Sequence, residues 1–176
     1  MAVYRLESFM MKLHSKRFFL RRLTALDATP QYLSWLEDPN ITRFIVYKQN
    51  SINALKHYIQ TQIDDDKTEF LGVFVEKSKQ HIGNVKFIFE DDSFKCFEMG
   101  IMIGEADWHG KGVAGEVLSL FASYAKKEHN SEVMTLKVEE NNKPAIRAYQ
   151  KLGFEVVDVT IEPPGYVMEW DLVELL

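Results

Sequence analysis

Three short apolar segments in the middle of the chain limit its fold more than any other feature of the sequence. They cover 70–76, 81–90 and 96–104, and each is rich in β-branched and aromatic residues. The links between them are short and polar, which is typical of hairpin connections. Because hairpins join neighbouring strands that run in opposite directions, we expect these three segments to form an antiparallel meander.

The apolar pattern changes after the third segment. From 112 to 129 the apolar residues recur at helical spacing, and a short strand-like segment follows at 133–138. The strand, helix and strand over 96–138 are long enough for a crossover between parallel neighbours. The sequence therefore predicts an α/β fold with a mixed sheet, in which antiparallel strands come first and a parallel pair lies in the middle.

The segments before the meander have recognisable boundaries. We expect a strand at 18–23, followed by a helix that Asp27 caps and that ends at 38–40. A second helix is expected at 52–63 with Ser51 as its N-cap.

The last part of the chain contains one more predicted helix and two more predicted strands. We expect a helix at 142–152 and closing strands at 154–161 and 166–173. Since no linker or internal repeat divides the chain, we expect one domain at 17–176, preceded by an N-terminal extension at 1–16.

Composition narrows the class of protein. The 176 residues are 46% hydrophobic and 27% charged, which is typical of a globular domain and not of a disordered chain. The formal net charge of −5 argues against a general nucleic-acid partner, which needs a basic face. No apolar run is long enough to span a membrane. The single cysteine, Cys96, fits a reducing compartment, so we expect a cytoplasmic protein without a metal site.

A glycine-rich segment follows the third strand and opens the helix after it. Gly110, Gly112 and Gly115 allow backbone N–H groups to approach a ligand closely. A helix N-terminus adds unpaired N–H donors and a partial positive charge, and Lys111 adds a full one. The segment therefore indicates a pyrophosphate site, with a tight strand-to-helix turn of small residues as the alternative.

The residues of this segment and of a second one match two motifs of a known family. The family's cofactor loop reads [Q/R]-x-x-G-x-[G/A]; Gly112 and Ala114 match, and His109 stands where Gln or Arg is usual. The next helix of the family reads N-x-x-A-x-x-x-Y-x-x-x-G-F. Its matches here are Asn142, Ala145, Tyr149, Gly153 and Phe154.

With both motifs in order, the chain resembles the GNAT superfamily of acyl-CoA-dependent N-acetyltransferases over about 17–174. Its opening at 18–44 looks like the branch that acetylates ribosomal-protein N-termini (alanine/serine). The resemblance implies direct transfer of acetyl from acetyl-CoA to a primary amine. The acceptor would be a small molecule (amino sugar, polyamine or aminoglycoside) or a protein N-terminus. A non-catalytic acyl-CoA-binding regulatory module is the alternative, and a homodimer through the closing strands stays open.

The resemblance also implies which residues bind acetyl-CoA. The strand before the loop would splay from its parallel neighbour, so that Met102 and Ile103 pair with the pantetheine arm through their backbone. Asn142 would bind the same arm or hold the splayed backbone. The residues implied for the pyrophosphate are His109, Gly110, Lys111, Gly112, Val113, Ala114 and Gly115.

Two residues are candidates for proton transfer. Tyr149 would be the general acid for the leaving thiolate, because a phenol with a pKa near 10 keeps its proton at neutral pH. The alternative for Tyr149 is a core position at helical spacing. Glu98 would be the base that takes the proton of the amine. Burying an unpaired carboxylate in an apolar strand costs free energy, so a functional role would explain its presence there. Its alternative is a structural salt bridge.

Overall fold

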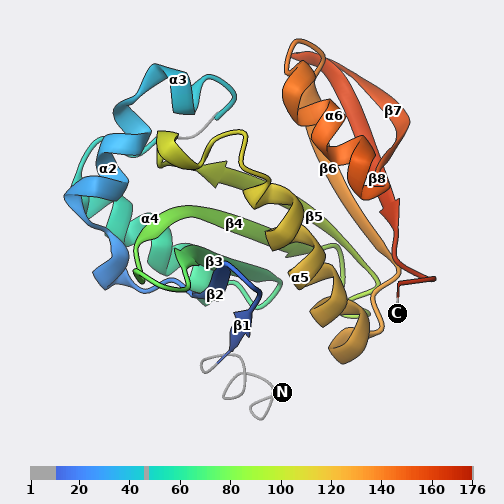
Figure 1. Cartoon of the computed structure of the whole chain (residues 1–176), viewed down its shortest axis with the longest axis horizontal. Helices are drawn as coiled ribbons and strands as arrows, with labels where there is room; N and C mark the ends of the chain where they lie inside the picture. The colour runs from blue at the N-terminus through green and yellow to red at the C-terminus, as the bar shows by residue number, and fades with distance from the viewer. Residues whose placement is uncertain (1–10, 46–47, 176) are drawn as a thin grey trace.

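The computed structural model describes residues 11–45 and 48–175. Its strands form one mixed sheet in the order β1-β2-β3-β4-β5-β6-β8-β7 (Figure 1). The described strands are β1 (Lys12–His14), β2 (Phe18–Arg22), β3 (Thr68–Val75), β4 (His81–Phe89), β5 (Cys96–Ile103), β6 (Val133–Glu139), β7 (Glu155–Ile161) and β8 (Pro164–Asp171). The described helices are η1 (Ala25–Asp27), α2 (Pro30–Glu37), α3 (Pro39–Thr42), α4 (Ile52–Asp64), η2 (Ala106–Trp108), α5 (Val113–His129) and α6 (Lys143–Leu152).

The meander and the parallel pair are confirmed. β3, β4 and β5 pair antiparallel in sequence order, whereas β5 and β6 run parallel. The parallel ladder joins only residues 96–98 to residues 133–135. Beyond it the two strands diverge, β5 staying on β4 and β6 on β8 (Figure 1). The sheet is therefore splayed between β5 and β6.

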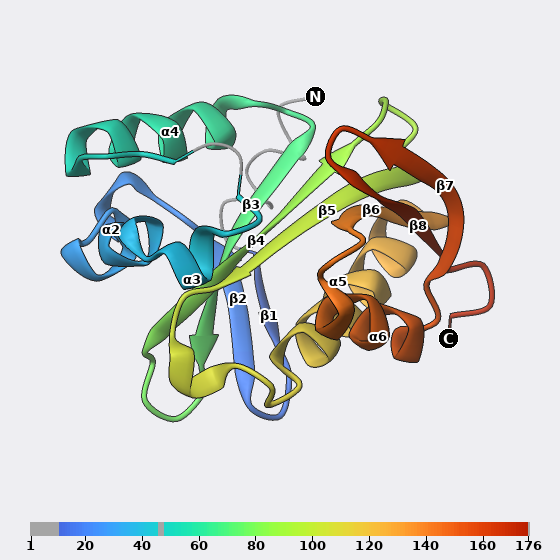
Figure 2. The ribbon, with the colours of Figure 1, turned by 90° about the horizontal axis from the view of Figure 1, so that it is seen from above.

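The helices cover both faces of the sheet (Figure 2). Buried residues of α5 and α6 pack with the strands in one large core, and buried residues of α2 and α4 pack in a smaller core on the opposite face. Alternation along β5 follows this division, since Phe97 and Met99 enter the large core and Met102 contacts the smaller one. The β5–α5 connection lies at one end of the sheet, where hydrogen bonds join it to Gln31 of α2 and to Arg17 just before β2.

One predicted helix start is wrong. The N-cap of α2 is Thr29, whose hydroxyl oxygen accepts a hydrogen bond from Tyr32 N at 3.2 Å. The carboxylate of Asp27 instead accepts hydrogen bonds from Arg21 at 2.7 and 2.9 Å and from Thr24 N. By contrast, Ser51 caps α4 as expected, accepting from Ala54 N.

The N-terminal segment contributes to the sheet. Residues 1–10 of the expected extension lie outside the described residues, but β1 pairs antiparallel with β2. The sheet thus begins before the expected boundary at residue 17. Within the described ranges, no helix has both the length and the apolar character to cross a bilayer.

Candidate active site

The connection from β5 to α5 is fixed against α2. The Cα of Gly104 lies so close to Trp35 that a Cβ there would overlap the indole ring. Glu105 then accepts hydrogen bonds from Trp35 Nε1 at 3.0 Å and from Gln31 Nε2 at 2.7 Å. Trp108 packs edge-on against Phe18, at the border of the large core. These contacts hold the loop at a defined place beside the end of β5.

Two glycines give the loop its shape. Gly110 and Gly112 have φ values of +69° and +73°, in the left-handed region that side chains disfavour. Gly112 is the N-cap of α5, and it has no side chain to cap the helix. A Cβ at Gly110 would meet no atom within 4 Å, so this side of the loop is open.

The loop and the start of α5 present a set of unpaired backbone donors. Of the hydrogen bonds formed by the described residues, none uses the N–H groups of Gly110, Gly112 or residues 113–115. The first bond of α5 runs from Glu116 N to Gly112 O at 3.2 Å. Because a helix start also carries a partial positive charge, this arrangement fits the diphosphate of a coenzyme.

His109 binds the protein itself. Its Nε2–H donates to the carbonyl oxygen of Ile103 at 2.7 Å, which ties the loop to the last residue of β5. One of the backbone groups expected to face pantetheine, the Ile103 carbonyl, is therefore already engaged. The donation that we expected from His109 to the coenzyme stays a prediction.

The edge of β5 is splayed from β6 at Met102 and Ile103, whereas the binding of pantetheine by these two residues stays a prediction. Both residues pair with β4, opposite Asn84 and Gly83. On their other side the β5–β6 ladder has already ended at Glu98, within the part of the chain that the structure describes. An unpaired strand edge of this kind can accept an extended chain with amide groups.

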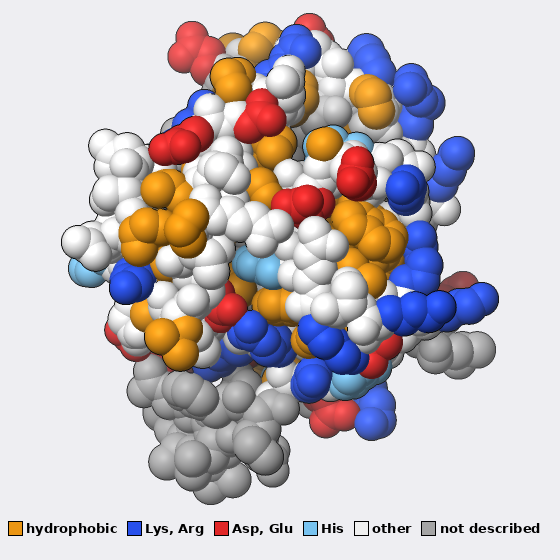
Figure 3. All heavy atoms as spheres, turned by 60° about the vertical axis from the view of Figure 1, so that its left-hand side comes forward, with side chains coloured by type: hydrophobic (Ala, Val, Ile, Leu, Met, Phe, Trp, Pro, Cys, Tyr) orange, Lys and Arg blue, Asp and Glu red, His pale blue; other side chains and the backbone are white. Residues whose placement is uncertain are grey.

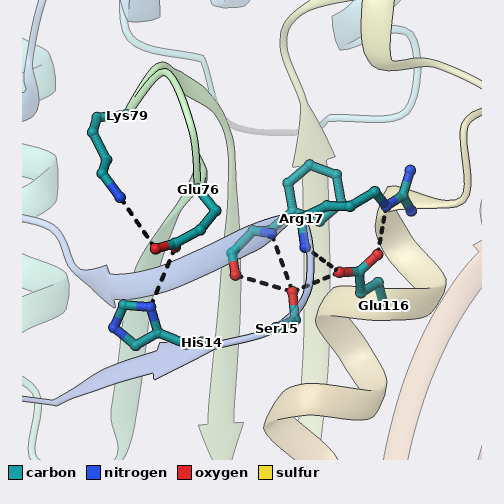
Figure 4. Close-up of polar contacts among 7 residues, drawn as sticks. His14, Ser15, Arg17, Glu76, Lys79 and Glu116 are labelled. Atoms are coloured by element: carbon teal, nitrogen blue, oxygen red, sulfur yellow. Dashed lines mark hydrogen bonds and ion pairs between the residues drawn. The ribbon is translucent and has the colours of Figure 1, made fainter.

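A charged clasp at the start of α5 was missed by the sequence analysis (Figure 4). Glu116 Oε1 accepts from Ser15 Oγ at 2.7 Å and from Arg17 N at 2.9 Å, and Oε2 accepts from Arg17 Nε at 2.7 Å. Partial burial alone would raise the pKa of Glu116, but the hydrogen bonds from Ser15 and Arg17 outweigh it and lower the pKa. An acidic residue in the first turn of a helix is too common to have revealed this clasp.

α6 approaches the loop from the far side of the splay. A Cβ at Gly115 would lie 3.6 Å from Leu152 Cδ2, so the small residue keeps α5 and α6 close. Tyr149 lies one turn before Leu152, on the same side of α6. At the start of α6, Asn142 Oδ1 accepts from Ala145 N at 3.4 Å, so this side chain caps the helix.

Tyr149 occupies the core position that was weighed as its alternative role. Its ring packs on the large core and contacts the Phe154 ring at 5.7 Å between centroids. Burial raises the pKa of Tyr149 to about 12. No hydrogen bond among the described residues uses its hydroxyl, which leaves the group available as a donor. The acid role stays a prediction.

Glu98 forms an ion pair. It lies at the end of the parallel ladder, opposite Thr135, on the face of β5 away from α5. Its Oε2 accepts from Lys137 Nζ at 2.8 Å, and the Glu98 side chain is 42% exposed. This contact is the salt bridge weighed as the alternative role, and the role as base stays a prediction.

The comparisons with known proteins agree with this geometry. Residues 17–155 match the family model described as the acetyltransferase (GNAT) domain. An N-acetyltransferase 9-like protein from Caenorhabditis briggsae is 28% identical over 156 residues, which are 79% of each chain.

Two solved structures share the fold. The GNAT-family acetyltransferase from Bacillus anthracis superposes with a TM-score of 0.81 at 16% identity, over 93% of this chain and 100% of that one. The spermidine N-acetyltransferase from Vibrio cholerae, solved with CoA and spermine, gives 0.78 at 20% identity, over 90% and 97%. Together with the family match over most of the chain, they lead to one assignment: this protein belongs to the GNAT acetyltransferase family.

Proposed function

We propose that the protein transfers an acetyl group from acetyl-CoA directly to a primary amine. The observation that carries this proposal is the row of unpaired N–H groups at Gly110, Gly112 and residues 113–115, beside the open edge of β5. A diphosphate and an amide-containing arm are the two chemical features that such neighbours would bind. Acetyl-CoA contains both, and its thioester supplies the activated acetyl group.

Each predicted residue has a task in this proposal. The N–H groups of the loop bind the diphosphate, and the edge at Met102 aligns the pantetheine arm. The amide nitrogen of Asn142 is left for the same arm, because its oxygen caps α6. The Tyr149 hydroxyl donates a proton to the departing thiolate. Its raised pKa keeps that proton in place at neutral pH.

The attacking amine must lose a proton, and Glu98 is our candidate to accept it. The Glu98 side chain is 42% exposed, so water can reach its carboxylate. Because Lys137 Nζ already binds one oxygen of Glu98, a solvent chain to Glu98 fits better than direct contact.

The acceptor is proposed only as a class: a primary amine on a small molecule or at a protein N-terminus. The spermidine N-acetyltransferase from Vibrio cholerae, solved with CoA and spermine, supports a polyamine among these. The face of the molecule drawn in Figure 3 does not favour one class of amine acceptor over another. Figure 3 shows acidic and hydrophobic side chains scattered over the face that it draws, and basic side chains mostly along its right-hand and lower edges. The cytoplasmic location, the homodimer and the absence of nucleic-acid and membrane partners also stay predictions.

Two measurements test the proposal. Calorimetric titration with acetyl-CoA is expected to give saturable one-site binding. A panel of polyamines, amino sugars, aminoglycosides and short peptides, assayed by release of free thiol, is then expected to identify the acceptor. Absence of acetyl-CoA binding would refute the proposal, whereas binding without turnover of any amine would favour the regulatory module.

A further inference from the structure

We propose that Arg17, on the turn between β1 and β2, binds a phosphate group of the coenzyme beside the glycine loop at residues 109–115. This inference rests on the proposed function. It concerns a residue more than 90 positions before the loop, which neither motif includes.

Arg17 is fixed beside the start of α5. Its Nε donates to Glu116 Oε2 at 2.7 Å (Figure 4). Its Nη1 donates to Lys111 O at 2.9 Å. Nη2 lies 3.7 Å from the place that a Cβ on Gly112 would take. The guanidinium is therefore held at the N-cap of α5, next to the unpaired N–H groups.

Donors remain on this guanidinium after its protein contacts are made. Of the five N–H groups of an arginine, the described contacts use one on Nε and one on Nη1, and none uses Nη2. A planar group with free paired donors is suited to phosphate oxygens. Since the charge is partly exposed, with 39% of the side chain accessible, a ligand can reach it.

The carboxylate of Glu116 does not take the place of the anion. Both of its oxygens accept hydrogen bonds from the β1–β2 turn, and neither caps the start of α5. Glu116 thus orients Arg17 and leaves the helix donors unoccupied. Glu116 also balances part of the charge of Arg17. The expected contribution of Arg17 to phosphate binding therefore comes from the orientation of its N–H donors as well as from its positive charge.

The other cations near the loop are placed differently. His109 stands where the family motif has Gln or Arg, but its Nε2–H is bonded to Ile103 O. The Nζ of Lys111 lies over the Trp108 ring, 5.7 Å from its centroid. Lys111 keeps its donors too, but among the described contacts two hydrogen bonds fix the Arg17 guanidinium at the N-cap, and none fixes the Lys111 ammonium there.

The test compares Arg17→Gln, Arg17→Lys and a matched control, Lys127→Gln. The control removes one positive charge from the far end of α5, about 20 Å away. Binding of CoA, of ADP and of pantetheine is measured for each folded variant, by calorimetry for CoA and by ligand-observed NMR for the weaker ligands. ADP carries the diphosphate without the arm, and pantetheine carries the arm without phosphate.

We expect Arg17→Gln to weaken CoA and ADP binding at least tenfold and to leave pantetheine binding within twofold. Arg17→Lys keeps the charge without the planar fork, and we expect it to weaken CoA threefold to tenfold. If Arg17→Gln does not fold, Arg17→Lys is compared with the Lys127→Gln control in its place.

Three results would overturn the inference. The first is that Arg17→Gln binds CoA with the same Kd as the Lys127→Gln control. If Arg17→Gln does not fold, the same result for Arg17→Lys counts. CoA and pantetheine could weaken equally, which would show that Arg17 acts only through the shape of the loop. Finally, the wild-type protein could fail to bind CoA at all, and this result alone would also remove the proposed function.

Discussion

At the scale of single residues, Tyr149 gives the sharpest test of chemistry. Its hydroxyl has no partner among the described residues, so Tyr149→Phe removes one donor and little packing. We expect kcat to fall tenfold or more, while the Kd for CoA stays within twofold. Thiol release and calorimetry measure the two quantities separately. An unchanged kcat would remove Tyr149 from the reaction.

The pKa of Tyr149 adds a prediction about pH. Burial raises this pKa to about 12, so the phenol stays protonated from pH 6 to pH 9. We therefore expect wild-type and Tyr149→Phe activities to keep a constant ratio from pH 6 to pH 9. A ratio that falls toward one within that range would mean that the phenol ionises there.

Gly112 tests the backbone of the loop. With φ at +73°, an alanine there would adopt the left-handed conformation, which costs about 1–2 kcal/mol. We expect Gly112→Ala to lower the free energy of unfolding by about that amount and to weaken CoA binding, as measured by urea unfolding and calorimetry. Gly100→Ala is the matched control, since a Cβ there meets no atom within 4 Å. Equal effects of the two changes would show that the loop does not need its glycine.

Residue roles were predictable where they depend on backbone geometry. The left-handed glycines and the cap at Ser51 follow from local sequence. The bond from His109 to Ile103 O and the pair of Glu98 with Lys137 depend on tertiary distance, which spacing does not give. Asp27 does not cap α2, because Thr29 takes that position and the Asp27 carboxylate accepts from Arg21 and Thr24 instead.

At the scale of elements, the clasp between the β1–β2 turn and α5 is expected to contribute to stability. Glu116→Gln removes a charge that accepts three hydrogen bonds, and we expect a loss of about 1–3 kcal/mol at pH 7. Because the folded pKa of Glu116 is lowered from 4.5, its contribution is present above that value and lost as pH falls.

Urea unfolding at pH 7 and at pH 4 measures this change. The difference between wild type and Glu116→Gln is expected to shrink at the lower pH, and Glu128→Gln at the far end of α5 serves as the control. A difference that grows as pH falls would contradict a lowered pKa.

Elements were easier to predict than their pairing. The meander follows from short polar links, and the crossover follows from the length of α5. The early end of the β5–β6 ladder was implied only by the family resemblance. Backbone alternation gives faces to a strand but does not show where its neighbour departs.

At the scale of the whole molecule, the sheet consists of two parts that meet at a short ladder. β1 to β5 form one part and β6, β8 and β7 form the other, and the described ladder between them joins residues 96–98 to 133–135. In the proposed complex, the coenzyme contacts the loop and β5 on one side and α6 on the other. Binding should therefore stabilise the two parts together.

Thermal unfolding measures this coupling. A ligand at 100 times its Kd stabilises the native state by about 2.7 kcal/mol, and for a chain of this size each kcal/mol raises Tm by about 2–4 °C. We thus expect CoA at that excess to raise Tm by about 5–11 °C in a single transition. ADP lacks the arm that reaches the splay, so at 100 times its own Kd it should raise Tm in the same way. It should leave the β6 amides that bond neither β8 nor β5 open to hydrogen exchange, whereas CoA should protect them. Equal protection by both ligands would show that the splay does not hold the arm.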